Sequence, residues 1–253
     1  MTLLLASCRA APNPAAVRAT LVVFAASSLT DAFTEIGTAF EQEHPGVDVA
    51  LSFGGSQMLR TQIEAGAPAD VFAAANSSEV EKLVDKGMVE ADAVRPFLSN
   101  RLIVILPAQN PARVQNLQDL AAPGIKVVLA AQEVPVGNYA RQSLMKMGTA
   151  FGVNFPGDVL KRVVSNEDNA RQVVAKIQLG EADAGIVYVS DAISAQELRT
   201  IEIPQDLNVI ATYPIAPLTR SGHPAEAASF VEYVLSPRGQ AILKAWGFAP
   251  PQP

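Results

Sequence analysis

Strand-like and helix-like segments alternate along almost all of this 253-residue chain, and this alternation limits the fold more than any other feature. The first strand-like run covers residues 20–24, and apolar residues then follow at the spacing of one helix face, at Leu29, Phe33, Ile36 and Phe40. Strands that are separated by helices usually run parallel in one sheet. The sequence therefore predicts an α/β fold with mixed, mostly parallel sheets.

The remaining strands and helices are assigned in the same way. Strands are expected at residues 47–53, 70–74, 125–131 and 185–189, and strands that cross between two lobes at 101–107 and 209–213. Several helices are expected to end at glycines, which are preferred just past a helix C-terminus, namely Gly66, Gly87, Gly148 and Gly180. Two helices close the chain, and the last of them is expected between Pro237 and Trp246.

Four of the expected helices begin directly after a strand or turn. Their starts lie at residues 28–31, 55–57, 135–137 and 168–170. The first N–H groups of a helix have no partner within it, and the helix dipole adds about half a positive charge. Several such starts around one cleft would bind an oxyanion without any lysine or arginine. Each start is also explained as an ordinary cap, and Ser28 with Asp31 has the pattern of a capping box.

The charge balance and the rare residue types exclude several functions. The net charge is −6 and no basic run occurs, which argues against nucleic acid and means that any anion site must be local. With only His44 and His223, a histidine-rich metal site is excluded and a Ser-His-Asp triad is not expected. The single cysteine, Cys8, allows no intramolecular disulfide. No apolar run reaches about 18 residues, so no membrane-spanning helix is expected.

Residues 1–19 differ in composition from the rest of the chain. They begin with a short apolar run and continue as a segment rich in alanine and proline. Residues 5–8 (LASC) resemble the lipobox of bacterial lipoprotein signal peptides, in which the cysteine is lipidated and becomes the mature N-terminus. We therefore expect a signal-peptide remnant, with Cys8 as a lipid anchor and the following residues as a tether.

Four segments carry a resemblance to a known family. They are residues 24–30 (FAASSLT), 62–72 (QIEAGAPADVF), 134–140 (VPVGNYA) and 185–192 (GIVYVSDA). In this order and at these separations they resemble the molybdate-binding proteins of bacterial ABC importers, over about residues 20 to 249. The resemblance implies a two-lobed periplasmic-binding-protein-like fold of class II, with the ligand in the cleft between the lobes. Residues 20–100 with 213–253 would form one lobe and residues 101–212 the other.

The resemblance also implies a set of ligand-binding residues. In the first lobe these are Ser28 and Ser56, each offering a hydroxyl and a backbone N–H. In the second lobe Val136 and Asn169 would offer backbone N–H groups, and Tyr188 its phenol. On this basis Ser28 is expected to cap its helix when the site is empty and to turn to the anion when it is filled. The neighbouring Asp168 is expected to point away from the anion.

The implied function is capture of molybdate, and of tungstate as well, outside the cytoplasmic membrane. A monomer would deliver the anion to the membrane subunits of an ABC permease, without catalysis, cofactor or any metal other than the molybdenum of the anion. Another tetrahedral oxyanion, such as sulfate or phosphate, is the nearest alternative. An enzyme of the porphobilinogen deaminase type would need a cysteine inside the fold, and a transcription regulator would need a DNA-binding domain. A ferric receptor would use Tyr139 together with Tyr188.

Overall fold

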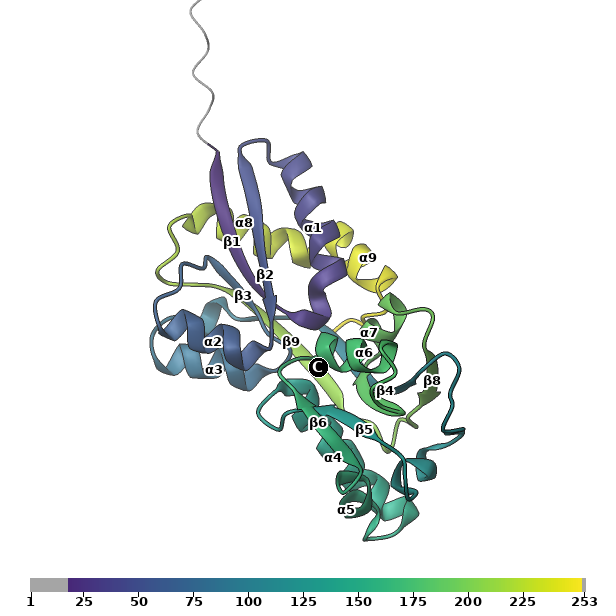
Figure 1. Cartoon of the computed structure of the whole chain (residues 1–253). Coiled ribbons are helices and arrows are strands. Elements are labelled where there is room, and N and C mark those ends of the chain that lie inside the picture. The colour runs from purple at the N-terminus through teal and green to yellow at the C-terminus, as the bar shows by residue number, and fades with distance from the viewer. Residues whose placement is uncertain (1–17, 252–253) are drawn as a thin grey trace, which may run out of the picture.

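The computed structural model describes residues 18–251, which form two lobes joined by crossing strands (Figure 1). Cys8 and the predicted tether lie outside these residues, apart from the last two positions of the tether. The first lobe contains β1 (Ala19–Ala26), α1 (Thr30–Glu43), β2 (Val47–Gly54), α2 (Ser56–Glu64), β3 (Val71–Ala73), α3 (Ser77–Asp85), α8 (Pro224–Leu235) and α9 (Pro237–Ala245). The second contains β5 (Val127–Ala130), α4 (Pro135–Phe151), α5 (Phe155–Leu160), β6 (Val163–Glu167), α6 (Ala170–Gln178), β7 (Ala184–Tyr188), α7 (Val189–Ser194) and β8 (Arg199–Glu202).

Two long strands, β4 (Arg95–Leu106) and β9 (Ile210–Pro217), connect the lobes. The strands follow the order β2-β1-β3-β9-β4-β7-β5-β6, and β8 pairs with β4. Within residues 18–251, the pairs among β1, β2 and β3 and among β5, β6 and β7 are parallel, and every antiparallel pair involves β4 or β9. The predicted mixed α/β fold is confirmed, but parallel pairs do not predominate: among the described residues they are as numerous as the antiparallel pairs, which the crossing strands supply.

The partner of β4 changes partway along the strand. Its first half pairs with β9, as far as Arg101, and its second half pairs with β7 from Leu102 onward. A single strand thus belongs to the sheets of both lobes. The backbone of β4 passes through the junction between the lobes without a loop, and each lobe keeps its own pairing.

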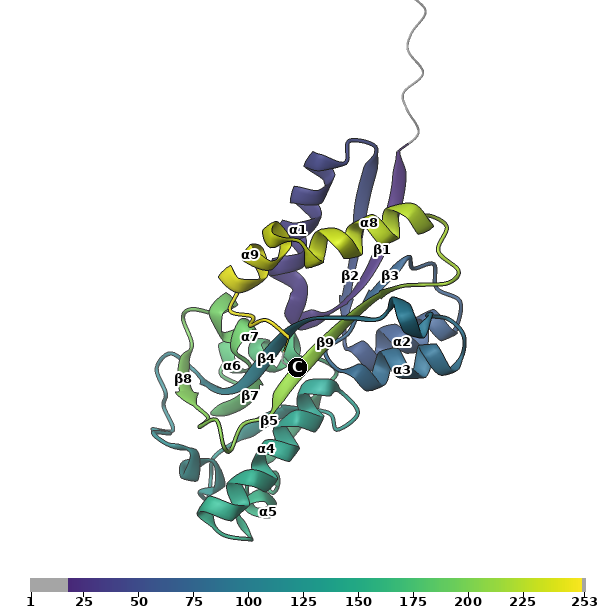
Figure 2. The ribbon, with the colours of Figure 1, turned by 180° about the vertical axis from the view of Figure 1, so that it is seen from behind.

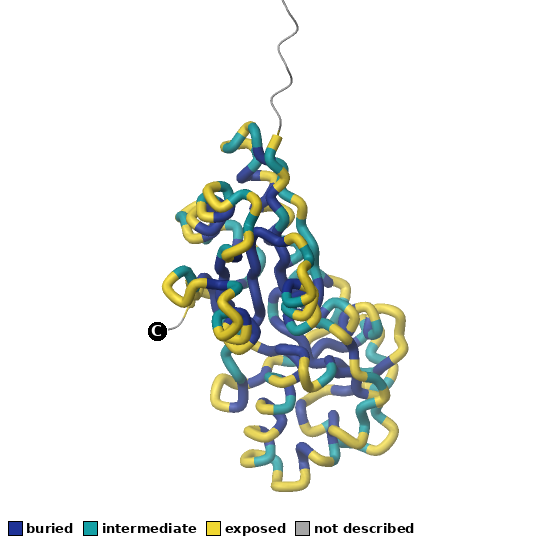
Figure 3. The backbone as a smooth tube through the Cα atoms, turned by 90° about the vertical axis from the view of Figure 1, so that its left-hand side faces the viewer, coloured by how far each residue is buried: buried dark blue, intermediate teal, exposed yellow. Residues whose placement is uncertain are grey.

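Helices cover both faces of the first-lobe sheet, and the buried residues lie between these layers. Helix α8 lies in front of β1 and β2 when the molecule is seen from behind (Figure 2). Phe230 of α8 meets Phe33 and Phe40 of α1 edge to face, with ring centroids 6.1 and 5.3 Å apart. Helices α2 and α3 cover a smaller cluster around Phe72 on the other side. The buried backbone continues from one lobe into the other along the crossing strands (Figure 3).

The predicted elements are present, but some of their bounds are wrong. Strand β4 begins at Arg95 instead of residue 101, β9 continues to Pro217 instead of residue 213, and the end of α4 also differs. Glycines with positive φ do follow α2, α3 and α6, at Gly66, Gly87 and Gly180. Helix α4, however, does not stop at Gly148 but continues to Phe151, and Gly152 with φ of 107° follows it. A Cβ on Gly148 would lie 3.0 Å from Pro156, so this glycine is explained by the close packing of α5 against α4. In the described part of the chain, no helix combines the length and apolarity needed to cross a membrane.

Candidate functional site

One small cavity between the lobes is lined by all five residues that were predicted to bind the ligand. It is far smaller than the roughly 300–1,000 Å³ typical of sites for larger ligands. Its lining carries no lysine, arginine, histidine, aspartate or glutamate. The lining residues are Ala26, Ser27, Ser28, Gly54, Gly55, Ser56, Ala75, Val134, Pro135, Val136, Asn169, Ala170 and Tyr188.

Helices α2 and α4 begin at this cavity from opposite lobes. In α2 the first intrahelical acceptor is the carbonyl of Gly55, which receives the N–H of Met58 and of Leu59, each at 3.0 Å. In α4 the first such bond runs from Asn138 N–H to the carbonyl of Val134, at 2.9 Å. The N–H groups of Ser56 and Val136 precede these bonds and have no acceptor within their own helices. Two positive helix ends therefore face the same small space.

Helix α6 contributes the third start, and here the side chain of Asn169 has a definite task. Its Oδ1 accepts the N–H of Gln172 at 3.0 Å, so Asn169 is the N-cap of α6 and its side chain holds the helix end. The adjacent Ala170 also lines the cavity, although the sequence analysis did not single it out. Asp168 is exposed and does not line the cavity, in agreement with the expectation that it points away.

The prediction that Ser28 caps the first helix is wrong. Ser28 lies inside a short 3-10 turn, η1 (Ser27–Leu29), which delays the start of α1 to Thr30. Leu29 is the N-cap residue of α1 and provides no side-chain cap. The hydroxyl of Ser28 instead lies 2.9 Å from the phenol oxygen of Tyr213 on β9, and both residues are buried. Asp31, the other half of the predicted capping box, is bound by Arg171 and Ser194.

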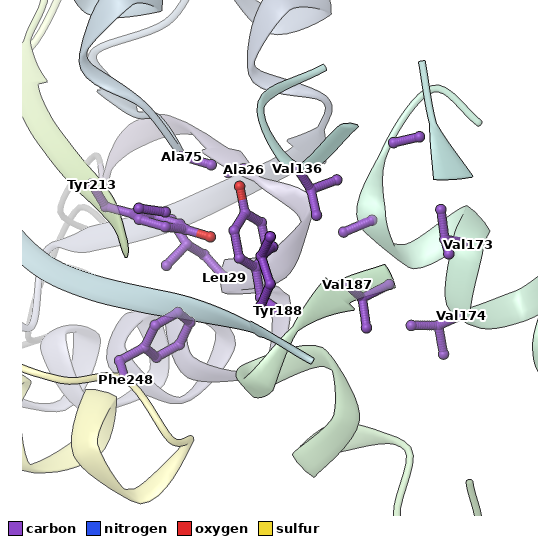
Figure 4. Close-up of a cluster of buried hydrophobic side chains, with 14 of the residues drawn as sticks. Ala26, Leu29, Ala75, Val136, Val173, Val174, Val187, Tyr188, Tyr213 and Phe248 are labelled. Atoms are coloured by element: carbon purple, nitrogen blue, oxygen red, sulfur yellow. The ribbon is translucent and has the colours of Figure 1, made fainter. Parts of the chain in front are cut away.

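The remaining two predicted hydroxyl donors belong to Ser56 and Tyr188. Ser56 Oγ accepts the N–H of Ala75 at 3.0 Å. The phenol oxygen of Tyr188 is fully buried and has no hydrogen-bond partner among the described residues. Burial raises the pKa of Tyr188 well above its ordinary value, so the phenol stays protonated. In Figure 4 this oxygen points towards Ala26 and Ala75, beside Val136.

Contacts across the cleft show that the lobes are closed. Gln57 of the first lobe donates its side-chain N–H to the backbone oxygen of Asp168 in the second, at 3.1 Å. Arg171 of α6 reaches back to the carboxylate of Asp31 and to the backbone oxygen of Ser27, the latter at 3.3 Å. The cavity is therefore bounded by both lobes, with polar contacts at its rim.

Iron binding by paired tyrosines has no support at this site. Tyr139 does not line the cavity, so it does not join Tyr188 there. Nowhere among residues 18–251 do three or more histidine, cysteine, aspartate or glutamate side chains gather in a way that could hold a metal ion. What the cavity offers is a set of N–H and O–H donors without a charged side chain, which is suited to binding an anion rather than to ligating a cation.

Two lobes that close over a small cavity of hydrogen-bond donors define a solute-binding protein. Residues 21–249 match the family described as bacterial extracellular solute-binding protein, and the chain belongs to this family. Membership confirms the prediction of a binding protein that is not an enzyme.

Individual relatives extend the comparison. The chain is 38% identical over 232 residues to the molybdate-binding protein ModA of Mycobacterium tuberculosis H37Rv, covering 91% of this chain and 85% of that protein. It is 33% identical over 245 residues to ModA of Escherichia coli K12, covering 94% and 92%. The periplasmic molybdate-binding protein of Azotobacter vinelandii has the same fold, with a TM-score of 0.79 at 24% identity over 92% of this chain and 100% of that one.

Proposed function

We propose that this protein is the extracytoplasmic receptor for molybdate of an ABC importer and delivers the anion to the permease subunits. One observation carries the proposal. The donors predicted from the sequence, Ser28 and Ser56 from one lobe and Val136, Asn169 and Tyr188 from the other, surround one uncharged cavity. Relatives that cover most of the chain and are named molybdate-binding proteins support it further.

The chemistry of the anion explains why donors alone suffice. Molybdate is a tetrahedral dianion without a proton at neutral pH, so each of its oxygens is only an acceptor. The two serines would donate hydroxyl and backbone N–H groups, Val136 and Asn169 backbone N–H groups, and Tyr188 its phenol O–H. Hydrogen phosphate carries a proton that needs an acceptor, and leaving it unpaired in a closed cavity costs about 1–3 kcal/mol. Tungstate has the same charge and nearly the same size, and we expect it to bind as well.

Calorimetric titration with molybdate, tungstate, sulfate and hydrogen phosphate tests the proposal. Molybdate and tungstate should bind one per chain, and at a hundredfold excess over Kd they should stabilise the fold by about 2.7 kcal/mol. Sulfate has the same charge and shape but shorter bonds, so cavity size alone would exclude it. Equal or tighter binding of sulfate or phosphate would contradict the molybdate assignment in favour of a receptor for that other oxyanion.

We also propose how the chain is organised around this function. The lobes would comprise residues 20–100 with 213–253 and residues 101–212, a division supported by the change of partner along β4 after Arg101. The protein would act as a monomer, held at the outer face of the cytoplasmic membrane by a lipid on Cys8. Mass spectrometry of the mature N-terminus in the native host should find an acylated Cys8. Cleavage after Ala19, which removes Cys8, would refute the anchor.

A further inference from the structure

The hydroxyl of Ser28 is bonded to a tyrosine that lies outside the cavity. Tyr213 belongs to the crossing strand β9, is completely buried, and does not line the cavity. Its phenol oxygen is 2.9 Å from Ser28 Oγ, and either hydroxyl could donate in this bond. Figure 4 shows that the oxygen of Tyr213 is directed towards Tyr188, at the edge of the same group of residues. Because Ser28 has one proton, the direction of this bond decides what the serine offers to the cavity.

The other serine of the site, Ser56, shows what a serine offers to the cavity when it accepts such a bond. Ser56 Oγ is bonded to a backbone N–H of Ala75, which can only donate. Ser56 is therefore the acceptor in that bond, and its own proton is left for the cavity. If Tyr213 likewise donates to Ser28, both serines present protons. If Ser28 donates to Tyr213 instead, it turns lone pairs towards the cavity, which would repel the oxygens of a fully deprotonated anion.

The phenol of Tyr213 always has a proton to donate. Burial raises its pKa well above the ordinary value, the contact with Ser28 opposes this rise, and the nearby carboxylate of Asp191 adds to it. The phenol of Tyr213 therefore stays protonated at neutral pH and well above it. Rings packed edge to face around it, those of Tyr188, Phe97 and Phe248 at 5.7, 6.5 and 6.0 Å, hold the phenol in place.

We propose that Tyr213 is a positioning residue that determines specificity: its O–H donates to Ser28 Oγ and thereby directs the proton of Ser28 into the cavity. The inference rests on the proposed function, because it explains how the site is kept free of hydrogen-bond acceptors at this position. Without the phenol oxygen, Ser28 can rotate and accept the proton of hydrogen phosphate. Molybdate gains nothing from that rotation, because it has no proton to donate.

The test compares Tyr213→Phe with the wild type by calorimetry, using molybdate and hydrogen phosphate at pH 8. Phenylalanine keeps the ring contacts, so the variant should fold, and a thermal melt checks this. Molybdate affinity should fall about 3- to 10-fold through lost preorganisation, while phosphate affinity stays or rises. The preference for molybdate over phosphate should thus fall at least about threefold, and by more if phosphate binding improves. Tyr233→Phe, which removes a phenol oxygen on α8 well away from the cavity lining, is the matched control and should leave both affinities unchanged.

A double-mutant cycle with Ser28→Ala separates the proposed effect from a general loosening of the site. In the Ser28→Ala background, Tyr213→Phe should leave the molybdate-to-phosphate ratio unchanged, because the group that it orients is gone. An equal loss for both anions, or a change in the ratio that persists without Ser28, would overturn the inference. Failure of the proposed function looks different: the wild type itself would not bind molybdate. If the wild type binds sulfate instead, the same cycle is measured with sulfate against hydrogen phosphate.

Discussion

Gly55→Ala should weaken ligand binding without weakening the folded protein, because the new methyl group would hinder closure of the lobes. Gly55 precedes α2 in the first lobe, with φ of −65° and ψ of 133°, a conformation that alanine adopts readily. In the closed form a Cβ at this position would lie 2.4 Å from the backbone oxygen of Asp168 in the second lobe. Contacts under 3.0 Å to a backbone atom require one of the two elements to shift.

The size of the effect follows from the cost of overpacking. Inserting one methyl group into a tightly packed contact costs about 1–3 kcal/mol. The Cβ would also lie 2.6 Å from the side-chain amide of Gln57 in the same lobe, but that flexible side chain can rotate away. Because the clash with the Asp168 oxygen exists only when the lobes are closed, its cost appears in the binding free energy and not in the folding of the open form. Affinity for the oxyanion should therefore fall roughly 5- to 150-fold. The stability of the ligand-free protein should stay the same or rise by about 0.4–1 kcal/mol, since alanine restricts the unfolded chain.

Calorimetry with molybdate and thermal melts of the ligand-free protein measure the two quantities separately. Gly46→Ala is the matched control, because no atom lies within 4 Å of a Cβ built there. Small-angle scattering of the wild type should show a smaller radius of gyration when molybdate is added, and Gly55→Ala should need more ligand for the same change. Wild-type affinity in Gly55→Ala would refute the idea that the ligand is held with the lobes this close.

Two further experiments address single side chains. Ser56→Ala and Tyr188→Phe should each lower molybdate affinity about ten- to a hundredfold. Val136→Ala should lower the affinity much less, because its backbone N–H remains. Calorimetry that ranks the three variants in the reverse order would contradict the assigned roles. Tyr188→Phe should also leave the thermal stability of the ligand-free protein unchanged or higher, because the phenol oxygen that it removes is buried without a partner among the described residues. Burial raises the pKa of Asp191 to about 6, against 3.8 in the unfolded chain, so the folded state binds this proton more tightly. Stability should therefore fall by about 3 kcal/mol as the pH rises from about 4 to 6, and denaturant titrations of Asp191→Asn should lack this component.

Most of the fold could be predicted because local sequence patterns indicate its helices and strands. The periodicity of apolar residues gave the helices, and glycines with positive φ marked several of their ends. The error at α4 has a tertiary cause, since Gly148 serves the packing of Pro156 rather than a helix terminus. Sequence alone cannot distinguish these two uses of a glycine, because both place it near the end of an apolar helical pattern.

The site was predictable only as far as its helix starts. Any one of them could be an ordinary cap, and Asn169 does cap α6 with its side chain. Ser28 does not cap α1, because a 3-10 turn intervenes and its hydroxyl meets Tyr213. That partner is 185 positions away and lies in a strand that was predicted only as a crossing between the lobes. No local signal could have identified it, because the contact depends on how β9 crosses between the lobes.

On the proposed function, recognition and closure become the same event. The protein has a net charge of −6, and the cavity lining contributes no cationic side chain, so long-range attraction cannot account for anion binding. Arg171, which contacts the backbone oxygen of the lining residue Ser27, is already bound to Asp31. The charge of the anion must then be balanced by N–H and O–H dipoles, which act strongly only where water is excluded.

Neither lobe holds a complete set of these dipoles. Ser28 and Ser56 lie on one side, and Val136, Asn169 and Tyr188 on the other, so an anion in the open form meets half of its donors and remains hydrated. A ligand shifts the lobes towards the closed form only by its difference in affinity for the two forms. An anion too small to reach both sets of donors, or one whose proton finds no acceptor, gains little on closing. Selectivity therefore depends on the geometry of the closed state, which Gly55 allows to form and in which Tyr213 acts from outside the cavity lining.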